Sequence, residues 1–234
     1  MIKSATVLFN PKKREGARMK RDVEKFLLQH NVKLSKKGDV VIAIGGDGTI
    51  LYNKYYGRPM FGIGSELSFL CQANAKNWRS ALEKVLKGYK IDKRAMLASE
   101  LDGKRLPDAL NEVCVRRSEH RIITINLRAG GRDYRFRADG VIFSTPTGST
   151  AYAYSCGGKE LPPHAKKYEV VAIAPLRREF KPLTVDENEI FHLFVERGDC
   201  ADVIIDGQLI FPLKKGSRLK VYKSGKTMEF VSAR

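Results

Sequence analysis

The chain has 234 residues, of which 43% are hydrophobic and 9% aromatic, enough apolar material for one large domain or two smaller ones. It contains no run of the roughly 18 to 20 apolar residues that a membrane-spanning helix needs, and its first residues lack the cleavage site of a secretion signal. Forty-three Lys and Arg against 26 Asp and Glu give a net charge of +17, which favours anionic partners such as nucleotides, polyphosphate or nucleic acid. We expect a cytoplasmic protein with no membrane segment.

The four cysteines and four histidines are scattered, without a CxxC pair or the spacing of metal ligands. Reduced thiols in a cytosolic protein explain this distribution better than a disulfide framework or a zinc site. The sequence therefore fixes no metal ligands.

The first 90 residues alternate strand and helix patterns. Residues 3–9 (KSATVLF) and 59–63 predict strands, and residues 12–30 and 78–86 carry apolar residues at helical spacing. Residues 39–44 (DVVIAI) form a continuous apolar run that ends at Gly45, typical of a central strand of a parallel sheet. This pattern predicts an N-terminal α/β, Rossmann-like domain over residues 1–90.

From residue 91 the pattern changes to short alternating strands, punctuated by turn residues at 130–131, 197–199 and 224–225. We therefore expect a β-rich, β-sandwich-like domain over residues 91–234. No proline-rich linker separates the two domains, so we expect them to pack together with the active site in the cleft between them.

The motif GGDGT, residues 45–49, directly follows the predicted central strand. Glycines allow a sharp turn and a close approach to a ligand, and exposed amides in such a loop bind anions. These properties predict a phosphate-donor loop made of Gly45, Gly46, Gly48 and Thr49. A carboxylate repels phosphate, so Asp47 suits a bound magnesium ion or an attacking hydroxyl instead. The alternative is an Asp-Gly hairpin turn, but residues 50–56 predict a helix rather than a second strand.

A second motif, residues 137–152 (RADGVIFSTPTGSTAY), places five Ser and Thr hydroxyls in one loop after a strand. Such a series suits hydrogen bonding to amide, ribose and base groups, beyond what a plain capped loop requires. Tyr152 at its end could stack on a ring or belong to the core.

Two weaker signals remain. Asn111 and Glu112 precede a strand and could grip two ribose hydroxyls, although such a pair is more often a solvated turn. Asp206 and Gly207 could form a hairpin turn or contribute to a site.

These four segments, in this order, resemble the NAD kinase family. The resemblance spans nearly the whole chain. Lipid kinases share GGDGT but lack STPTGSTAY. The sequence departs from the family at residues 62–70 (GIGSELSFL), where an Asn and two glycines are replaced, and at residues 175–182, where the usual Pro-His…Arg-Pro is altered.

The resemblance implies roles for individual residues. Asp47 would be the catalytic carboxylate, with Gly46 in the phosphate loop. Asn111 and Glu112 would bind NAD near a ribose and the adenine, and Asp139 would contact the nicotinamide end, from its own or a neighbouring subunit. The other residues implied in the NAD pocket are Phe69, Thr147, Thr150, Ala151, Tyr152, Ser155 and Asp206.

The resemblance further implies an NAD kinase, a phosphotransferase that moves a phosphoryl group from ATP or polyphosphate to the adenosine ribose 2′-hydroxyl of NAD and yields NADP. It also implies Mg²⁺ or another divalent cation, and a homo-oligomer, either a dimer or a tetramer. Two alternatives stay open: a lipid kinase, and a nucleic-acid-binding protein that uses the +17 charge. The sequence lacks an aromatic-rich RNA-recognition strand, so we expect no nucleic acid partner.

Overall fold

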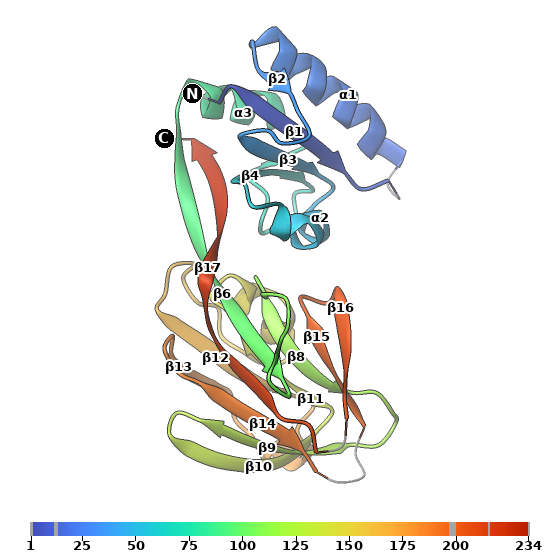
Figure 1. Cartoon of the computed structure of the whole chain (residues 1–234), viewed down its shortest axis with the longest axis vertical. Helices are drawn as coiled ribbons and strands as arrows, with labels where there is room; N and C mark the ends of the chain where they lie inside the picture. The colour runs from blue at the N-terminus through green and yellow to red at the C-terminus, as the bar shows by residue number, and fades with distance from the viewer. Residues whose placement is uncertain (1, 12–13, 197–199, 215, 234) are drawn as a thin grey trace. The chain divides into compact units, whose positions relative to one another are not determined.

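The computed structural model describes residues 2–11, 14–196, 200–214 and 216–233 (Figure 1). The chain forms two compact units, residues 1–93 with 228–234 and residues 94–227. The last residues of the chain thus return to the first unit, in contrast to a division into two continuous halves.

The first unit is built on a parallel sheet in the order β2-β1-β3-β4. Its strands are β1 Ser4–Phe9, β2 Lys33–Leu34, β3 Val40–Ile44, β4 Met60–Gly64 and β5 Ala73–Asn74. The strand β3 pairs in parallel with β1 and β4, and all of its residues are buried. The apolar run therefore forms the central strand that the sequence predicts.

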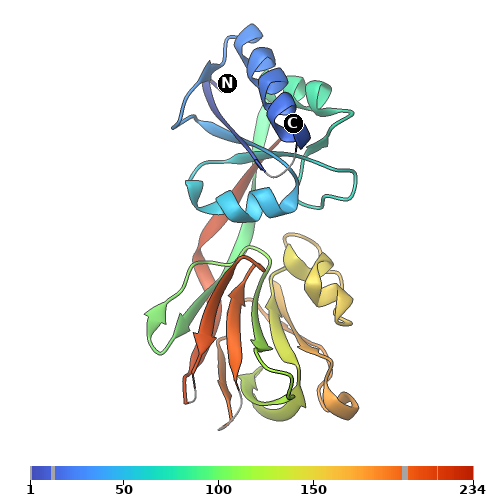
Figure 2. The ribbon, with the colours of Figure 1, turned by 90° about the vertical axis from the view of Figure 1, so that its right-hand side faces the viewer.

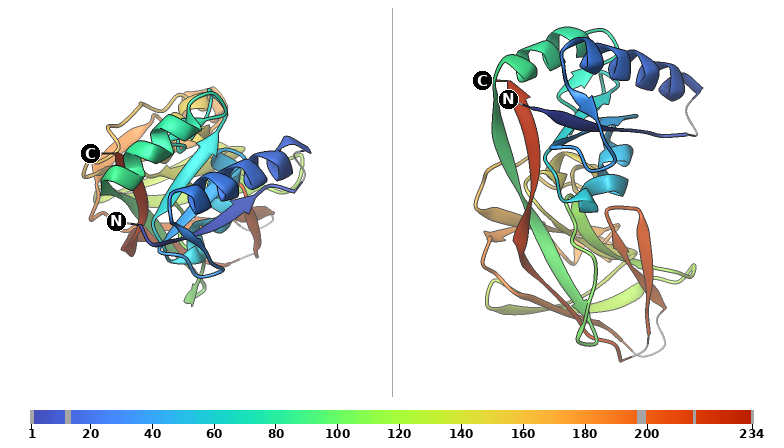
Figure 3. Two further views of the ribbon diagram at one scale, coloured as in Figure 1. Left: turned by 90° about the horizontal axis from the view of Figure 1, so that it is seen from above. Right: turned by 45° about the horizontal axis from the view of Figure 1, so that its top comes forward.

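Helices cover both faces of this sheet (Figure 3). They are α1 Arg14–Gln29, α2 Asp47–Asn53, η1 Lys54–Tyr56 and α3 Trp78–Lys87. On one face α1 and α3 share a core with the strands, and the rings of Phe26 and Trp78 lie 5.5 Å apart. On the other face Ile50 of α2 packs against Gly62, where a Cβ would lie 2.6 Å from the Ile50 Cδ1 atom. The glycine of β4 thus allows α2 to lie close to the sheet. None of the helices in the described ranges is long and apolar enough to cross a bilayer.

The second unit is a β-sandwich (Figure 2). One sheet has the antiparallel order β13-β12-β11-β8-β15-β16, and the other contains β10-β9-β14-β17 with β6 and β7. The strands are β6 Tyr89–Leu101, β7 Lys104–Arg105, β8 Glu112–Arg117, β9 Ile123–Ala129, β10 Arg132–Ala138, β11 Gly140–Ser144, β12 Lys167–Ile173, β13 Leu183–Asp186, β14 Phe191–Val195, β15 Ala201–Ile205, β16 Leu209–Leu213 and β17 Leu219–Ala233. Alternate residues from both sheets form the core between them.

Three short helices complete the second unit, η2 Gly148–Thr150, α4 Tyr152–Ser155 and η3 Leu176–Arg178. Ala153 of α4 packs with Cys114, Ile142 and Val171 on the outer face of the β13–β16 sheet. The predicted α/β domain followed by a β-sandwich is confirmed.

One predicted turn is wrong. Ser224 and Gly225 do not interrupt the chain but lie inside β17, which is continuous over 15 residues. The turn at Gly130 and Gly131 is confirmed, with positive φ at both residues between β9 and β10. The turn expected at residues 197–199 lies outside the described residues.

Candidate active site

The GGDGT loop connects β3 to α2. Gly45 and Gly46 have φ angles of 141° and 96°, which residues with a Cβ rarely adopt. The helix α2 then begins at Asp47, so the motif forms a strand-to-helix turn and not a hairpin. The conformation of the loop therefore explains both glycines.

The Asp47 carboxylate binds the backbone of a later loop. Its Oδ2 accepts the N–H of Phe69 at 2.9 Å, and its Oδ1 accepts the N–H of Leu70 at 3.0 Å. The thiol of Cys71 lies 3.8 Å from Oδ1. The segment that follows β4 is therefore fixed to the GGDGT loop through this one side chain.

That segment is the one that departs from the NAD kinase pattern. The Ser68 hydroxyl accepts the N–H of Ser65 at 3.0 Å and closes a tight turn. A Cβ on Gly46 would lie 3.2 Å from the same hydroxyl, so the turn packs against the GGDGT loop. Two serines thus supply local structure where the sequence lacks the family's Asn and glycines.

In the second unit Asp206 holds the Asn111–Glu112 segment. Its side chain is buried, and its carboxylate accepts the N–H groups of Leu110, Asn111 and Glu112 at 2.8 to 3.0 Å. Asp206 and Gly207 also form the β15–β16 turn, with φ angles of 50° and 63°. The predicted turn at Asp206 is therefore confirmed, and the same carboxylate fixes the backbone of residues 110–112.

The Ser/Thr loop packs against the other side of Asn111. The Thr145 N–H donates to the Asn111 carbonyl at 2.9 Å, and the Thr145 hydroxyl donates to the Leu110 carbonyl at 2.6 Å. Gly148 lies so close that a Cβ there would collide with the Asn111 carbonyl oxygen. Three motifs that are far apart in the sequence thus form one hydrogen-bonded framework.

Most hydroxyls of this loop serve its own structure. Ser144 donates to the Thr145 carbonyl, and Ser149 donates to the Pro146 carbonyl. The interpretation of the whole series as ligand donors is therefore too broad. Within the described part of the chain, Thr147 Oγ1 and Asn111 Oδ1 are buried atoms of this framework for which the structure records no hydrogen-bond partner. Burying such atoms costs free energy unless a ligand or a water molecule forms a hydrogen bond with them.

Comparison with known proteins supports the resemblance to NAD kinases. A family model described as the ATP-NAD kinase C-terminal domain matches residues 110–233. An NAD kinase from Thermococcus gammatolerans is 37% identical over 204 residues, which cover 82% of this chain and 73% of the relative. An NAD kinase from Methanoculleus marisnigri is 32% identical over 200 residues, with 83% and 74% covered. The crystal structure of an NAD kinase from Archaeoglobus fulgidus in complex with ATP superposes with a TM-score of 0.86 at 25% identity, covering 99% of this chain and 94% of that one.

The chain belongs to the NAD kinase family. It is therefore an enzyme, a phosphotransferase that acts on NAD. A lipid kinase, the nearest enzymatic alternative, does not fit these matches.

The remaining residues that the NAD kinase resemblance implies lie on and around α4. Thr150, Ala151, Tyr152 and Ser155 follow one another along η2 and α4, and all are at least partly exposed. Burial raises the pKa of the Tyr152 hydroxyl, and the neighbouring Cys156 thiol, which it contacts, raises it further. Tyr152 is 36% exposed and so retains ring surface for contact with a ligand.

Asp139 lies at the other end of β11 from the Ser/Thr loop. The strand between them spans five residues, about 17 Å at the usual rise for antiparallel strands. Asp139 forms an ion pair with Arg117, with 2.7 Å between the Arg117 Nε and its Oδ1. The structure therefore does not bring Asp139 together with Asn111 or Thr147 of the same chain.

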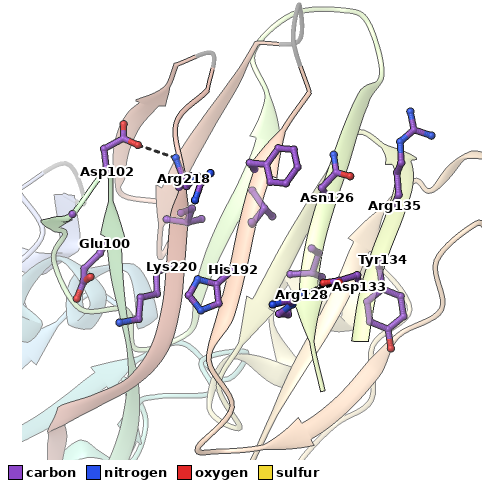
Figure 4. A pocket seen from close by; sticks show the side chains of 15 residues that line it. Glu100, Asp102, Asn126, Arg128, Asp133, Tyr134, Arg135, His192, Arg218 and Lys220 are labelled. Atoms are coloured by element: carbon purple, nitrogen blue, oxygen red, sulfur yellow. Dashed lines mark hydrogen bonds and ion pairs between the residues drawn. The ribbon is translucent and has the colours of Figure 1, made fainter. Parts of the chain in front are cut away.

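A cavity of about 810 Å³ lies elsewhere in the second unit, on the outer face of strands β9, β10, β14 and β17 (Figure 4). Figure 4 shows His192 and Lys220 on neighbouring strands of its floor, where the two residues are register partners. None of the predicted site residues lines it. Of its charged side chains, Arg128 forms an ion pair with Asp133 across the lining, and Arg135 forms one with Glu196 outside it.

Across the described ranges, no cluster of three or more His, Cys, Asp or Glu residues could hold a metal ion by itself. None of the four cysteines, all of which lie within the described residues, forms a disulfide.

Proposed function

We propose that this enzyme transfers a phosphoryl group from ATP or polyphosphate to the 2′-hydroxyl of the adenosine ribose of NAD and yields NADP. The observation that carries the proposal is the framework around Asn111. It places a buried acceptor, Asn111 Oδ1, and a buried hydroxyl, Thr147 Oγ1, without protein partners at the meeting point of three motifs. A ribose and its base offer both the donors and the acceptors that these atoms require.

Asp47 would act on the hydroxyl that attacks. Each of its oxygens accepts one backbone N–H, and a carboxylate oxygen can accept two hydrogen bonds, so capacity for a ligand hydroxyl remains. The new bond forms between the 2′-oxygen and phosphorus while the bond from phosphorus to the donor's bridging oxygen breaks. In the loose transition state of phosphoryl transfer the hydroxyl proton becomes acidic late, and Asp47 would accept it then.

The residues present are compatible with magnesium that arrives on the donor. Mg²⁺ usually keeps several waters and binds one or two carboxylates together with substrate phosphates. Asp47 is the carboxylate of the donor loop, and we propose it as the protein ligand. The cation would neutralise negative charge on the donor phosphates.

We propose a homo-oligomer in which Asp139 serves the NAD pocket of a neighbouring subunit. The support is its distance from the Ser/Thr loop of its own chain, about five strand residues away. Sedimentation at micromolar concentration should show a dimer or a tetramer. A fully active monomer would contradict this proposal.

One assay tests the reaction itself. The purified chain is incubated with NAD and either ATP or polyphosphate, with Mg²⁺ or with EDTA. NADP is detected by a dehydrogenase specific for it, and any phosphorylated analogue is detected by mass spectrometry. We expect NADP only in the presence of the cation, and no product from a 2′-deoxyribose analogue of NAD. Phosphorylation of that analogue would rule out the 2′-position, and no product with either donor would rule out the reaction.

A further inference from the structure

Glu169 is a buried carboxylate that no step of the proposed reaction uses. It lies on β12 and is fully buried, 0% exposed. Its register partner on β11 is Ser144, whose partner on β8 is Glu112. Side chains alternate between the two faces of a sheet, and the residues two positions away along these strands pack against α4. Glu169 therefore lies on the face of the sheet that α4 covers, in register with Glu112 of the proposed NAD pocket.

The side chain of Glu169 holds the chain segment that leaves α4. Its Oε1 accepts the N–H of Lys159 at 2.6 Å. Its Oε2 lies against Gly158, where a Cβ would be only 2.6 Å from that oxygen. The N–H of Gly158 in turn donates to the carbonyl of Ala153 in α4 at 3.0 Å. The carboxylate is thus in direct contact with the exit of the helix.

Ser149 holds the same segment at a second point. The Leu161 N–H donates to the Ser149 hydroxyl at 2.8 Å, and that hydroxyl donates to the Pro146 carbonyl at 2.7 Å. The segment from Gly157 to Leu161 is therefore fixed on one side to the Ser/Thr loop and on the other to β12. Tyr152 and Ser155 of α4 lie in the sequence between Ser149 and Gly158, so both ends of the helix are connected to these fixed points.

A carboxylate is an expensive group to bury, because its charge loses the solvation of water. An apolar residue at this position would fill the same face of the sheet without that cost, as Val171 does two residues later. The Lys159 N–H, however, would then lose its acceptor. The arrangement is therefore explained by the orientation of α4 and not by packing alone.

We infer that Glu169 is a positioning residue for NAD binding, which fixes the exit of α4 and through it the placement of Tyr152 and Ser155. The inference rests on the proposed function, since it assumes that these two residues contact NAD. Glu169 itself touches no substrate.

The test measures binding and turnover separately. NAD affinity is measured by calorimetry without donor, and the KM of the phosphate donor is measured at saturating NAD, for Glu169→Ala, Glu169→Gln and the wild type. Glu169→Ala should weaken NAD binding about fivefold to tenfold, the factor that corresponds to one lost hydrogen bond, and leave the donor KM within about twofold. Glu169→Gln keeps an acceptor for Lys159 and should restore NAD affinity to within about twofold of wild type.

Glu160→Ala is the matched control, because Glu160 lies in the same segment but is exposed. Its NAD affinity should equal that of the wild type. Should Glu169→Ala fail to fold, Gly158→Ala takes its place, since its Cβ would lie 2.6 Å from the Glu169 carboxylate and 2.9 Å from the Ala153 carbonyl and would therefore disturb the contact between Glu169 and α4. It should weaken NAD binding in the same way.

Three results would overturn the inference. The first is unchanged NAD affinity in Glu169→Ala, or in Gly158→Ala where that variant replaces it. The second is an equal weakening of NAD binding and of donor binding, and the third is a loss of NAD affinity in Glu169→Gln as large as that in Glu169→Ala. A wild-type protein that binds no NAD would instead overturn the proposed function, so the two failures are distinguishable.

Discussion

At the scale of single residues, Asp47 combines two tasks that are usually separate. It fixes the loop after β4 through two amide hydrogen bonds, and it is the carboxylate proposed to accept the proton of the 2′-hydroxyl. Loss of function in an Asp47 variant could therefore come from a displaced loop or from lost chemistry. A test must separate the two.

We predict that Asp47→Asn lowers kcat by at least about 100-fold while NAD still binds, because a general base typically contributes 10²- to 10⁴-fold. Asp39→Asn provides the control. Asp39 also accepts two backbone N–H groups, of Lys3 and Ser4, in the same unit but away from the GGDGT loop. Steady-state kinetics and thermal melting of both variants should show a similar loss of stability and a loss of kcat only at Asp47. If Asp47→Asn retained most of its activity, Asp47 would have only the structural role of fixing the loop after β4.

Asp206 allows a similar comparison between two Asp-Gly turns. Asp206 and Asp102 both have positive φ, 50° and 52°, and each is followed by a glycine with positive φ. Only Asp206 is buried, with three amide hydrogen bonds. Asn tolerates this backbone conformation, so a change to Asn isolates the effect of the carboxylate.

We predict that Asp206→Asn costs about 2 to 3 kcal/mol of stability, because its amide nitrogen would face backbone N–H groups, and raises the KM for NAD. Asp102→Asn should cost less stability, because the Asp102 carboxylate is exposed and accepts only the Ser217 hydroxyl and the Arg218 N–H, and it should leave the KM for NAD unchanged. Urea unfolding and NAD titration check both variants. Equal behaviour of the two would show that the turn, and not the carboxylate, determines the effect.

Glu169 predicts a pH dependence of stability. Burial raises the pKa of its carboxyl above the ordinary value of 4.5, against smaller lowering effects from the Lys159 N–H and its charge. The folded protein therefore binds this proton more tightly than the unfolded chain does. The contribution of this proton to the stability of the folded protein is fully present below pH 4.5 and is lost as the pH rises through the folded-state pKa of Glu169.

Glu169→Gln removes this titration. The stability of the wild type relative to the Gln variant should therefore fall as the pH rises from about 4.5 toward 8. Melting temperatures of both proteins across this range measure it, with Glu160→Gln as an exposed control that shows no such trend. A difference that is constant with pH would contradict the prediction.

At the scale of secondary-structure elements, the sequence predicted the strands and helices in which the pattern of buried residues is regular along the whole element. The strand β3 is apolar throughout because both of its faces are covered, and α3 shows its buried residues at helical spacing. The strand β17 differs, because residues 223–227 are mostly exposed where it passes from the second unit to the first. A polar Lys-Ser-Gly-Lys segment without apolar side chains has the composition of a turn, so the strand was not recognisable.

The candidate site was predictable in its residue types but not in its contacts. Asp206 binds the amide of Leu110, 96 residues earlier, and Asp47 binds that of Leu70. Backbone N–H groups are present at every non-proline position, so no sequence pattern marks which ones a carboxylate will bind. The role of Glu169 is hidden for the same reason.

Two glycines test this account of the elements. A Cβ at Gly148 would collide with the Asn111 carbonyl, whereas at Gly225 nothing lies within 4 Å and φ is not in the left-handed region. We predict that Gly148→Ala destabilises the protein and weakens NAD binding. Gly225→Ala should instead be neutral or stabilising by up to about 1 kcal/mol, since glycine costs conformational entropy within a strand. Thermal melting distinguishes the two, and marked destabilisation by Gly225→Ala would support a turn.

At the scale of the whole molecule, the positive charge is unevenly distributed along the chain. Residues 1–93 contain 19 Lys and Arg against 8 Asp and Glu, whereas residues 94–227 contain 23 against 17. In the second unit several arginines are paired, Arg128 with Asp133, Arg135 with Glu196 and Arg137 with Glu179. The larger excess therefore belongs to the unit that carries the GGDGT loop.

We predict from this distribution that the excess charge attracts the phosphate donor more than it affects stability. Raising the ionic strength from about 0.05 to 0.5 M shortens the screening length to a few ångströms, so the KM for ATP or polyphosphate should rise. The melting temperature should change little, because exposed ion pairs such as Arg128–Asp133 contribute at most about 1 kcal/mol each. Initial rates at a series of KCl concentrations, with melting curves in the same buffers, measure both effects. The KM for NAD, which carries less charge than ATP, is the internal control and should respond less. A donor KM that does not change with salt would show that the positive charge of residues 1–93 plays no part in binding the donor.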